Sequence, residues 1–301
     1  MKVTSYSILA ATIFSGAAAT NVVDLSVDLE TSAQVDSNSG AQVLNQVLSE
    51  RPHVRAGLVL EDGRIVAEYV REDVNVSMPW YVWSITKSWM SLLIGKLVES
   101  GSLSLEDTLY NIWPDEALWA NVTGSNVDFR KNVTIRSLLT MSSGLIDDRR
   151  CNCTTADGGP VGGSNLIDTL SFTTETKEPG KFLYIGGLNI LSYVILERSG
   201  LSPREYAGQN VLPLLGILDS EIEWWRNEDG LETSYHGLFL TSRQMAKFGQ
   251  LFLQGGLSSP GQRLISSDWV SNSSHAQVDF VMDVEGYPLQ GSYGIFASIR
   301  S

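Results

Sequence analysis

The segment "WSITKSWMSLLIGKLVESG", residues 83–101, constrains the fold most, because apolar side chains recur along it at helical spacing. The recurring positions are Trp89, Leu92, Leu93, Leu97 and Val98. Gly101 is a typical helix-terminating residue. We expect this helix to be largely buried. With 301 residues, 43% of them hydrophobic, the chain can build that core as one large domain or two smaller ones.

The segments on either side of this helix predict an α+β fold. In "VRAGLVLEDGRIVAEYV", residues 54–70, two apolar runs flank Glu61-Asp62-Gly63 and predict a β-hairpin with a tight turn. Residues 105–219 alternate short apolar helical segments with connections rich in Gly, Pro and Asn, which predicts a mainly helical subdomain. "TSRQMAKFGQLFLQGG", residues 241–256, predicts a helix with a Thr-Ser cap and a Gly-Gly end. Strand-like residues return only in "GSYGIFASI", residues 291–299.

The N-terminal residues have the pattern of a secretory signal peptide. Lys2 precedes a short apolar run, and small residues follow it, so we expect a signal peptide over residues 1–19. The alternative is a membrane anchor, but the run is shorter than the roughly 20 residues of a spanning helix. The Asn-x-Ser/Thr triplets begin at Asn75, Asn121, Asn132, Asn152 and Asn272. Together these features predict a secreted, extracellular glycoprotein.

The net charge of −13 disfavours binding to nucleic acids and to anionic membrane surfaces. The cysteines are Cys151 and Cys153, too few for a disulfide scaffold, although a local bridge between them stays open. A metal site there is disfavoured because His53, His236 and His275 are scattered along the chain. No metal or organic cofactor is implied.

Ser84 and Lys87 lie three positions apart, so they share one helix face and the amine can reach the hydroxyl. A serine hydroxyl needs a base, and a lysine amine can serve when its surroundings leave it neutral part of the time. Apolar neighbours such as Trp83 could provide that desolvation, and the helix N-terminus would favour an oxyanion. The alternative treats Ser84 as an N-cap and Lys87 as a surface charge. On spacing alone this alternative is favoured, because about one Ser-x-x-Lys is expected by chance in such a chain.

Several motifs in order change that balance. "WSITKSWMSLLIGKLVESGSLSLEDTLYNIWP" and "VTIRSLLTMSSGL" are followed by "PGKFLYIGG", "LPLLGILDSEIEW" and "GLFLTSRQMAKFGQLFLQGG". From about residue 40 onward the chain resembles the serine β-lactamase and penicillin-binding-protein superfamily. Its nearest branch is the class C β-lactamase-related one, which includes esterases, D-aminopeptidases and nylon-oligomer hydrolases. The resemblance implies an antiparallel sheet flanked by helices, with a mainly helical inserted domain, over residues 20–301.

The same resemblance implies roles for three side chains. Ser84 would be the acylated nucleophile, and Lys87 its base or proton relay. Tyr184, in "FLYIGG", would move the serine proton and protonate the leaving group, provided that nearby cations lower the usual phenol pKa of about 10. Without the flanking match, Tyr184 would be interpreted as an ordinary buried aromatic residue.

Two departures from the family pattern affect these expectations. Gly186 stands where the branch has a polar residue that contacts the lysine and substrate, and Asn189 lies nearby but out of register. No Lys-Thr-Gly or His-x-Gly motif follows in the expected context, and we interpret His236-Gly237 as a loop or structural pair. We therefore expect the C-terminal strands of the fold to be missing from this sequence, as in a truncated chain, which would leave the 54–70 hairpin with little to pair with.

The leading functional hypothesis is a secreted serine hydrolase that cleaves a small-molecule amide or ester through an acyl-enzyme on Ser84. A transpeptidase is disfavoured because no transmembrane anchoring segment is predicted. The competing hypothesis is a non-catalytic pseudoenzyme or binding protein that keeps the pocket, and a structural or adhesive extracellular role is a third. The sequence leaves the substrate and the oligomeric state open.

Overall fold

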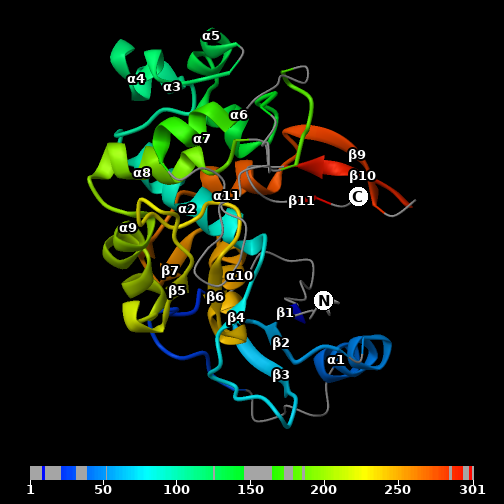
Figure 1. Cartoon of the computed structure of the whole chain (residues 1–301). Coiled ribbons are helices and arrows are strands. Elements are labelled where there is room, and N and C mark those ends of the chain that lie inside the picture. The colour runs from blue at the N-terminus through cyan, green and yellow to red at the C-terminus, as the bar shows by residue number, and fades with distance from the viewer. Residues whose placement is uncertain are drawn as a thin grey trace. The chain divides into compact units, whose positions relative to one another are not determined.

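The computed structural model describes residues 9–10, 22–31, 39–51, 53–124, 126–145, 165–172, 179–184, 187–284, 287–293 and 298–299. The chain divides into two compact units (Figure 1). Unit 1 comprises Met1–Val82, Gly208–Glu223 and Phe239–Ser266. Unit 2 comprises Trp83–Ala207, Trp224–Leu238 and Ser267–Ser301.

A three-stranded sheet of unit 1 has the order β1 (Leu9–Ala10), β2 (Ala56–Glu61), β3 (Arg64–Val70). β2 and β3 are antiparallel and joined at Asp62 (φ +49°) and Gly63 (φ +76°). Positive φ at both central residues characterises the type I′ turns that match strand twist in tight hairpins. The predicted hairpin is therefore confirmed. β1, within the predicted signal peptide, pairs with β2 in parallel; the other residues of 1–19 lie outside the described residues.

Helix α1 (Ser39–Glu50) covers the β2–β3 hairpin. Its Leu44 packs against Val59, Val66 and Ala67. This small apolar cluster gives the hairpin a buried face, which an isolated two-stranded ribbon would lack.

Helix α10 (Ser242–Leu253) also belongs to unit 1 and begins as predicted. The Thr241 hydroxyl accepts from the Gln244 backbone N–H, and the Gln244 side chain accepts from the Thr241 backbone N–H. This capping box satisfies two backbone donors at the helix start. The helix ends before Gly255 and Gly256, which both have positive φ.

Other elements of unit 1 are η1 (Leu212–Leu215), η2 (Asp219–Glu221), β4 (Trp80–Tyr81), β7 (Leu257–Ser259) and β8 (Gln262–Arg263). β4 pairs with the part of β6 (Leu238–Leu240) that lies in this unit.

The central element of unit 2 is α2 (Ile85–Glu99), the helix predicted from residues 83–101. Ten of its residues are buried, and Gly101 follows its C-terminus with φ +75°. A Cβ added at Gly95 would lie 2.5 Å from the Trp269 ring of α11 (Ser267–Ser274), so the glycine permits close approach of that indole. α2 also packs against α8 (Ile190–Ser199). The prediction of a buried helix is confirmed.

The elements among the described residues of 105–219 are helices, which agrees with the predicted helical character. The range is divided between the two units after Ala207, so its extent as one subdomain stays a prediction. Besides α8 and η1, the helices are α3 (Leu109–Ile112), α4 (Glu116–Ala120), α5 (Val127–Lys131), α6 (Ile135–Leu139), α7 (Leu166–Phe172) and α9 (Pro203–Asn210). Their short lengths agree with the frequent Gly, Pro and Asn connections of the sequence.

The prediction that strand residues return only at 291–299 was wrong. β5 (Glu223–Trp224) and β6 precede that range, and β9 (Val278–Val284) pairs with β10 (Tyr287–Tyr293), which pairs with β11 (Ser298–Ile299). Strands of two or three residues are too short to show an alternating pattern. β9 and β10 contain Asp, Pro and Gly, which are depleted in strands, so their pairing overrides local preference.

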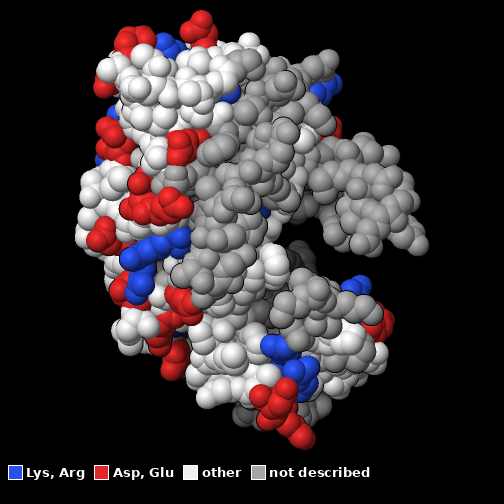
Figure 2. All heavy atoms as spheres, viewed as in Figure 1, with Lys and Arg blue, Asp and Glu red and all other residues white. Residues whose placement is uncertain are grey.

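On the face shown in Figure 2, Lys, Arg, Asp and Glu side chains of the described residues are distributed over several areas. Several form exposed ion pairs, such as Arg136 with Glu106 at 2.7 Å and Lys131 with Glu116 at 2.8 Å. Such pairs contribute little to stability because solvent screens them.

No helix among the described residues is long and apolar enough to cross a membrane. Cys151, Asn152, Cys153 and Gly186 lie outside the described residues.

Candidate active site

The three predicted site residues meet in unit 2. The Ser84 hydroxyl oxygen lies 2.5 Å from the Tyr184 hydroxyl oxygen and 2.8 Å from Lys87 Nζ. Ser84 precedes α2 in a helical conformation and its side chain makes no capping hydrogen bond. Ser84 thus occupies the N-cap position of the alternative interpretation, but its hydroxyl faces the amine and the phenol and does not cap the helix.

The backbone before Ser84 is constrained. Trp83 has φ +48°, which is unusual for a bulky residue, and its side chain is exposed. Its carbonyl accepts from the Thr86 hydroxyl, which in turn accepts from the Leu238 backbone N–H. These contacts hold the turn that precedes α2. The Ser84 side chain at this turn is exposed.

Lys87 is 1% exposed, so its interpretation as a surface charge was wrong. Its Nζ also donates to the Tyr235 backbone carbonyl at 2.8 Å. The same atom lies 4.8 Å from the centroid of the Tyr184 ring and 5.8 Å from that of Tyr235. Burial disfavours a charged amine, whereas the carbonyl and the two ring faces stabilise it.

Tyr184 belongs to a short described segment, residues 179–184, that is tied to the loop after α6. Leu183 N–H donates to the Met141 carbonyl, and Gly180 N–H donates to the Ser142 carbonyl. Tyr184 itself is 37% exposed, with its hydroxyl on Ser84. It is therefore not the ordinary buried aromatic residue of the alternative interpretation.

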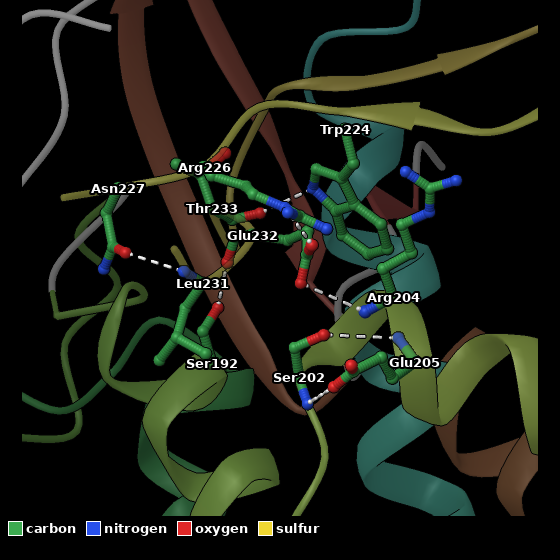
Figure 3. A network of polar contacts seen from close by, with 10 residues as sticks. All are labelled: Ser192, Ser202, Arg204, Glu205, Trp224, Arg226, Asn227, Leu231, Glu232 and Thr233. Carbon is green, nitrogen blue, oxygen red and sulfur yellow. Dashed lines mark hydrogen bonds and ion pairs between the residues drawn. The ribbon is translucent and has the colours of Figure 1, made fainter. Parts of the chain in front are cut away.

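The carbonyl that binds Lys87 belongs to residues 232–238, here called the 232–238 segment. Its backbone is tethered at successive positions. Thr233 N–H donates to the Trp225 carbonyl at 3.0 Å. The Trp224 indole donates to the Thr233 carbonyl at 2.9 Å (Figure 3). Farther along, Trp225 N–H donates to the Gly237 carbonyl at 2.9 Å. These bonds hold the part of the chain that contains Tyr235.

Helix α8 tethers the same segment from another side. Ser192 N–H donates to the Ser234 hydroxyl, and the two hydroxyl oxygens lie 2.6 Å apart. The Asn189 side-chain oxygen, noted in the sequence as out of register, accepts from the Ser234 N–H at 3.4 Å and is buried. Asn189 thus contacts the 232–238 segment.

His236 lies in this segment as part of a loop, with its ring 4.1 Å from the Tyr235 ring and 5.7 Å from the Trp225 ring, centroid to centroid. Sequence reasoning missed the Tyr235 carbonyl, because a backbone acceptor has no side-chain signature. The nearest feature of the sequence is the His236-Gly237 pair, which marks the loop but does not identify the carbonyl. Among the described residues, no cluster of three His, Cys, Asp or Glu side chains could hold a metal ion.

The "Beta-lactamase" family model matches residues 48–294. A 6-aminohexanoate-dimer hydrolase of Paenarthrobacter ureafaciens is 23% identical over 254 residues, which cover 79% of this chain and 62% of that protein.

Solved structures share the fold. An octameric penicillin-binding protein homologue from Pyrococcus abyssi has a TM-score of 0.61 at 21% identity, over 86% of this chain and 64% of that chain. A penicillin-binding protein homologue from Caulobacter crescentus has a TM-score of 0.59 at 13% identity, over 89% of this chain and 82% of that chain. The sequence thus spans less than two thirds of the Paenarthrobacter and Pyrococcus relatives. Because the family match covers most of the sequence, this chain belongs to the beta-lactamase family.

Proposed function

We propose that this protein is a serine hydrolase that cleaves an amide or ester through an acyl-enzyme on Ser84. The observation that carries the proposal is the placement of one hydroxyl between an amine at 2.8 Å and a phenol at 2.5 Å. Both partners are within the range for proton transfer to or from a serine nucleophile.

The acylation step uses a neutral Lys87. Such an amine has two N–H donors and one lone pair, so it can donate to the Tyr235 carbonyl and accept the Ser84 proton. As the serine oxygen bonds to the substrate carbonyl carbon, the carbonyl electron pair moves onto its oxygen. The transient ammonium is stabilised by the Tyr235 carbonyl and by the face of the Tyr184 ring.

The leaving group departs when its bond to the acyl carbon breaks, and it takes a proton from the Tyr184 phenol. The Lys87 ammonium then restores the phenol, so the proton taken from Ser84 replaces the one that leaves with the amine or alcohol. Water repeats these steps in reverse to release the acid and regenerate Ser84. The backbone N–H of Ser84 lies at the positive end of the 15-residue helix α2, where the helix dipole favours negative charge on the substrate oxygen.

The substrate class rests on the relatives. The Paenarthrobacter protein is named a 6-aminohexanoate-dimer hydrolase, and such a dimer is joined by an amide bond. We propose a small molecule of amide or ester type as the substrate.

We also propose that the protein is exported and glycosylated. The support is the signal-peptide pattern at residues 1–19 and the exposure of the four sequon asparagines in the described residues. These are Asn75, Asn121, Asn132 and Asn272. Expression of the full chain in a eukaryotic secretory host tests this proposal. Recovery from the medium with a mobility shift after N-glycan removal supports it, and retention of an unglycosylated chain in the cytosol contradicts it.

A covalent serine probe tests the proposed reaction. The full chain is incubated with a tagged fluorophosphonate, and the modified peptide is identified by mass spectrometry. We expect labelling of Ser84 that Ser84→Ala abolishes. Ser102→Ala is the matched control, because Ser102 is exposed and its hydroxyl contacts Ser100. Cooperative unfolding of the parent without labelling at Ser84 would support the non-catalytic alternative.

A further inference from the structure

We propose that Glu232 is a positioning residue for the Ser84–Lys87 pair. Its buried carboxylate fixes the 232–238 segment so that the Tyr235 carbonyl holds the Lys87 amine against Ser84. The inference rests on the proposed function and assigns a further residue to the same site.

The Glu232 side chain has no solvent exposure. Its Oε1 accepts from Arg226 Nε at 2.8 Å, and its Oε2 accepts from the Arg204 backbone N–H at 3.1 Å (Figure 3). Arg204 is the second residue of α9, where backbone N–H groups and the helix dipole favour a carboxylate. A buried carboxylate is costly without such partners, so these contacts define where Glu232 can lie.

Glu232 precedes Tyr235 by only three positions. The Glu232 carbonyl accepts from the Ser192 hydroxyl at 2.5 Å, and Ser192 also contacts Ser234. The segment is therefore tethered before Tyr235 by the carboxylate and by α8. Small displacements of catalytic groups reduce rates strongly, and a shift of the Tyr235 carbonyl moves the acceptor that holds Lys87.

The two partners of Glu232 explain why a carboxylate is required. Both are N–H donors, so both carboxylate oxygens must accept. In Glu232→Gln, the new amide NH₂ would face either Arg226 or the start of α9, where a donor already points. The variant keeps the shape of the side chain but loses one of the two contacts.

Arg226 provides a second perturbation that leaves Glu232 in place. Its side chain is 51% exposed, so Arg226→Gln removes the ion pair without burying a new group. The matched control is Glu205→Gln. The Glu205 carboxylate also accepts at the start of α9, from the Ser202 N–H at 2.9 Å, but it is exposed and has no hydrogen bond to the 232–238 segment.

The titration of Lys87 Nζ, followed by ¹⁵N NMR of the full chain and assigned with Lys87→Met, separates positioning from general destabilisation. The Tyr235 carbonyl stabilises the ammonium, so loosening the segment lowers the pKa of Lys87. If Arg226→Gln acted only through the lost positive charge, the pKa of Lys87 would rise, because removing a nearby positive charge favours the ammonium. A lower pKa of Lys87 in both Glu232→Gln and Arg226→Gln therefore reports a displaced Tyr235 carbonyl and not the electrostatic effect of the lost charges.

We expect both variants to lower kcat for a chromogenic ester by about tenfold or more with little change in KM, and Glu205→Gln to keep the parent values. Folded variants with parent kcat and parent Lys87 titration would overturn the inference, as would opposite titration shifts in the two variants. If Glu232→Gln does not fold, Arg226→Gln decides the outcome alone. Failure of the probe to label Ser84 would refute the proposed function, whereas the Lys87 titration reports the anchoring without turnover.

Discussion

Tyr184→Phe removes a single hydroxyl from the centre of the candidate site. That hydroxyl lies 2.5 Å from Ser84 Oγ, whereas the ring, 4.8 Å from Lys87 Nζ, is retained. Because Tyr184 is 37% exposed and only one hydrogen bond is lost, the free energy of unfolding should fall by about 1 kcal/mol. For a chain of this size the melting temperature should fall by a few degrees at most.

The effect on activity depends on the leaving group. Proton delivery by a positioned side chain contributes about 10²–10⁴ in rate. A p-nitrophenolate departs without a proton, so its ester should lose less than about tenfold in kcat/KM. An alkyl amine must be protonated before it departs, so the matching amide should lose about 10²–10⁴.

The assay measures kcat/KM for esters and amides of one acyl group with leaving groups of increasing basicity. Tyr110→Phe is the control, because the Tyr110 hydroxyl takes no part in the site. This hydroxyl hydrogen-bonds to Glu116, and that contact raises the pKa of Tyr110. We expect the loss in Tyr184→Phe to grow with the basicity of the leaving group. An equal loss across the series would refute proton delivery by Tyr184, and parent rates throughout would remove its hydroxyl from the mechanism.

Three other changes test the site and its supporting helix. Ser84→Ala and Lys87→Ala should each lower ester kcat/KM by orders of magnitude, and the double variant should lose little more, because the two groups act as a unit; additive losses would argue against this. The parent should turn over penicillins and cephalosporins weakly or not at all, and Gly186→Asn should gain amide or β-lactam cleavage; rapid nitrocefin hydrolysis by the parent would contradict this. Gly95→Ala places a Cβ 2.5 Å from the Trp269 ring, so overpacking of about 1–3 kcal/mol should exceed the roughly 1 kcal/mol gain in helix propensity. Denaturant unfolding measures the difference, and an equally stable variant would show that the indole moves aside.

Local patterns in the sequence determined several elements of this protein. The Asp-Gly turn between two apolar runs predicted the β2–β3 hairpin, because a tight turn needs positive φ at both central residues. Apolar spacing and terminal Gly residues predicted α2 and α10, and the spacing of Ser84 and Lys87 placed amine and hydroxyl on one helix face. Each of these signals involves residues within a few positions of one another.

Several strands could be identified only from the tertiary structure. β4 pairs with β6 through Trp80 and Leu240, and neither strand is long enough to show a period of its own. β9 and β10 pair despite residues that disfavour strands, because cross-strand hydrogen bonds replace what local propensity lacks.

The site itself shows the same division. The ordered motifs identified Ser84, Lys87 and Tyr184 as candidates, but spacing alone favoured a capping serine and a surface lysine. Only the tertiary structure buries Lys87 and brings Tyr184 to Ser84 across 100 positions of sequence. The Tyr235 carbonyl reaches Lys87 across 148 positions. Such contacts depend on how whole segments pack, and a backbone carbonyl is common to every residue, so no local pattern could identify the acceptor that holds the amine in place.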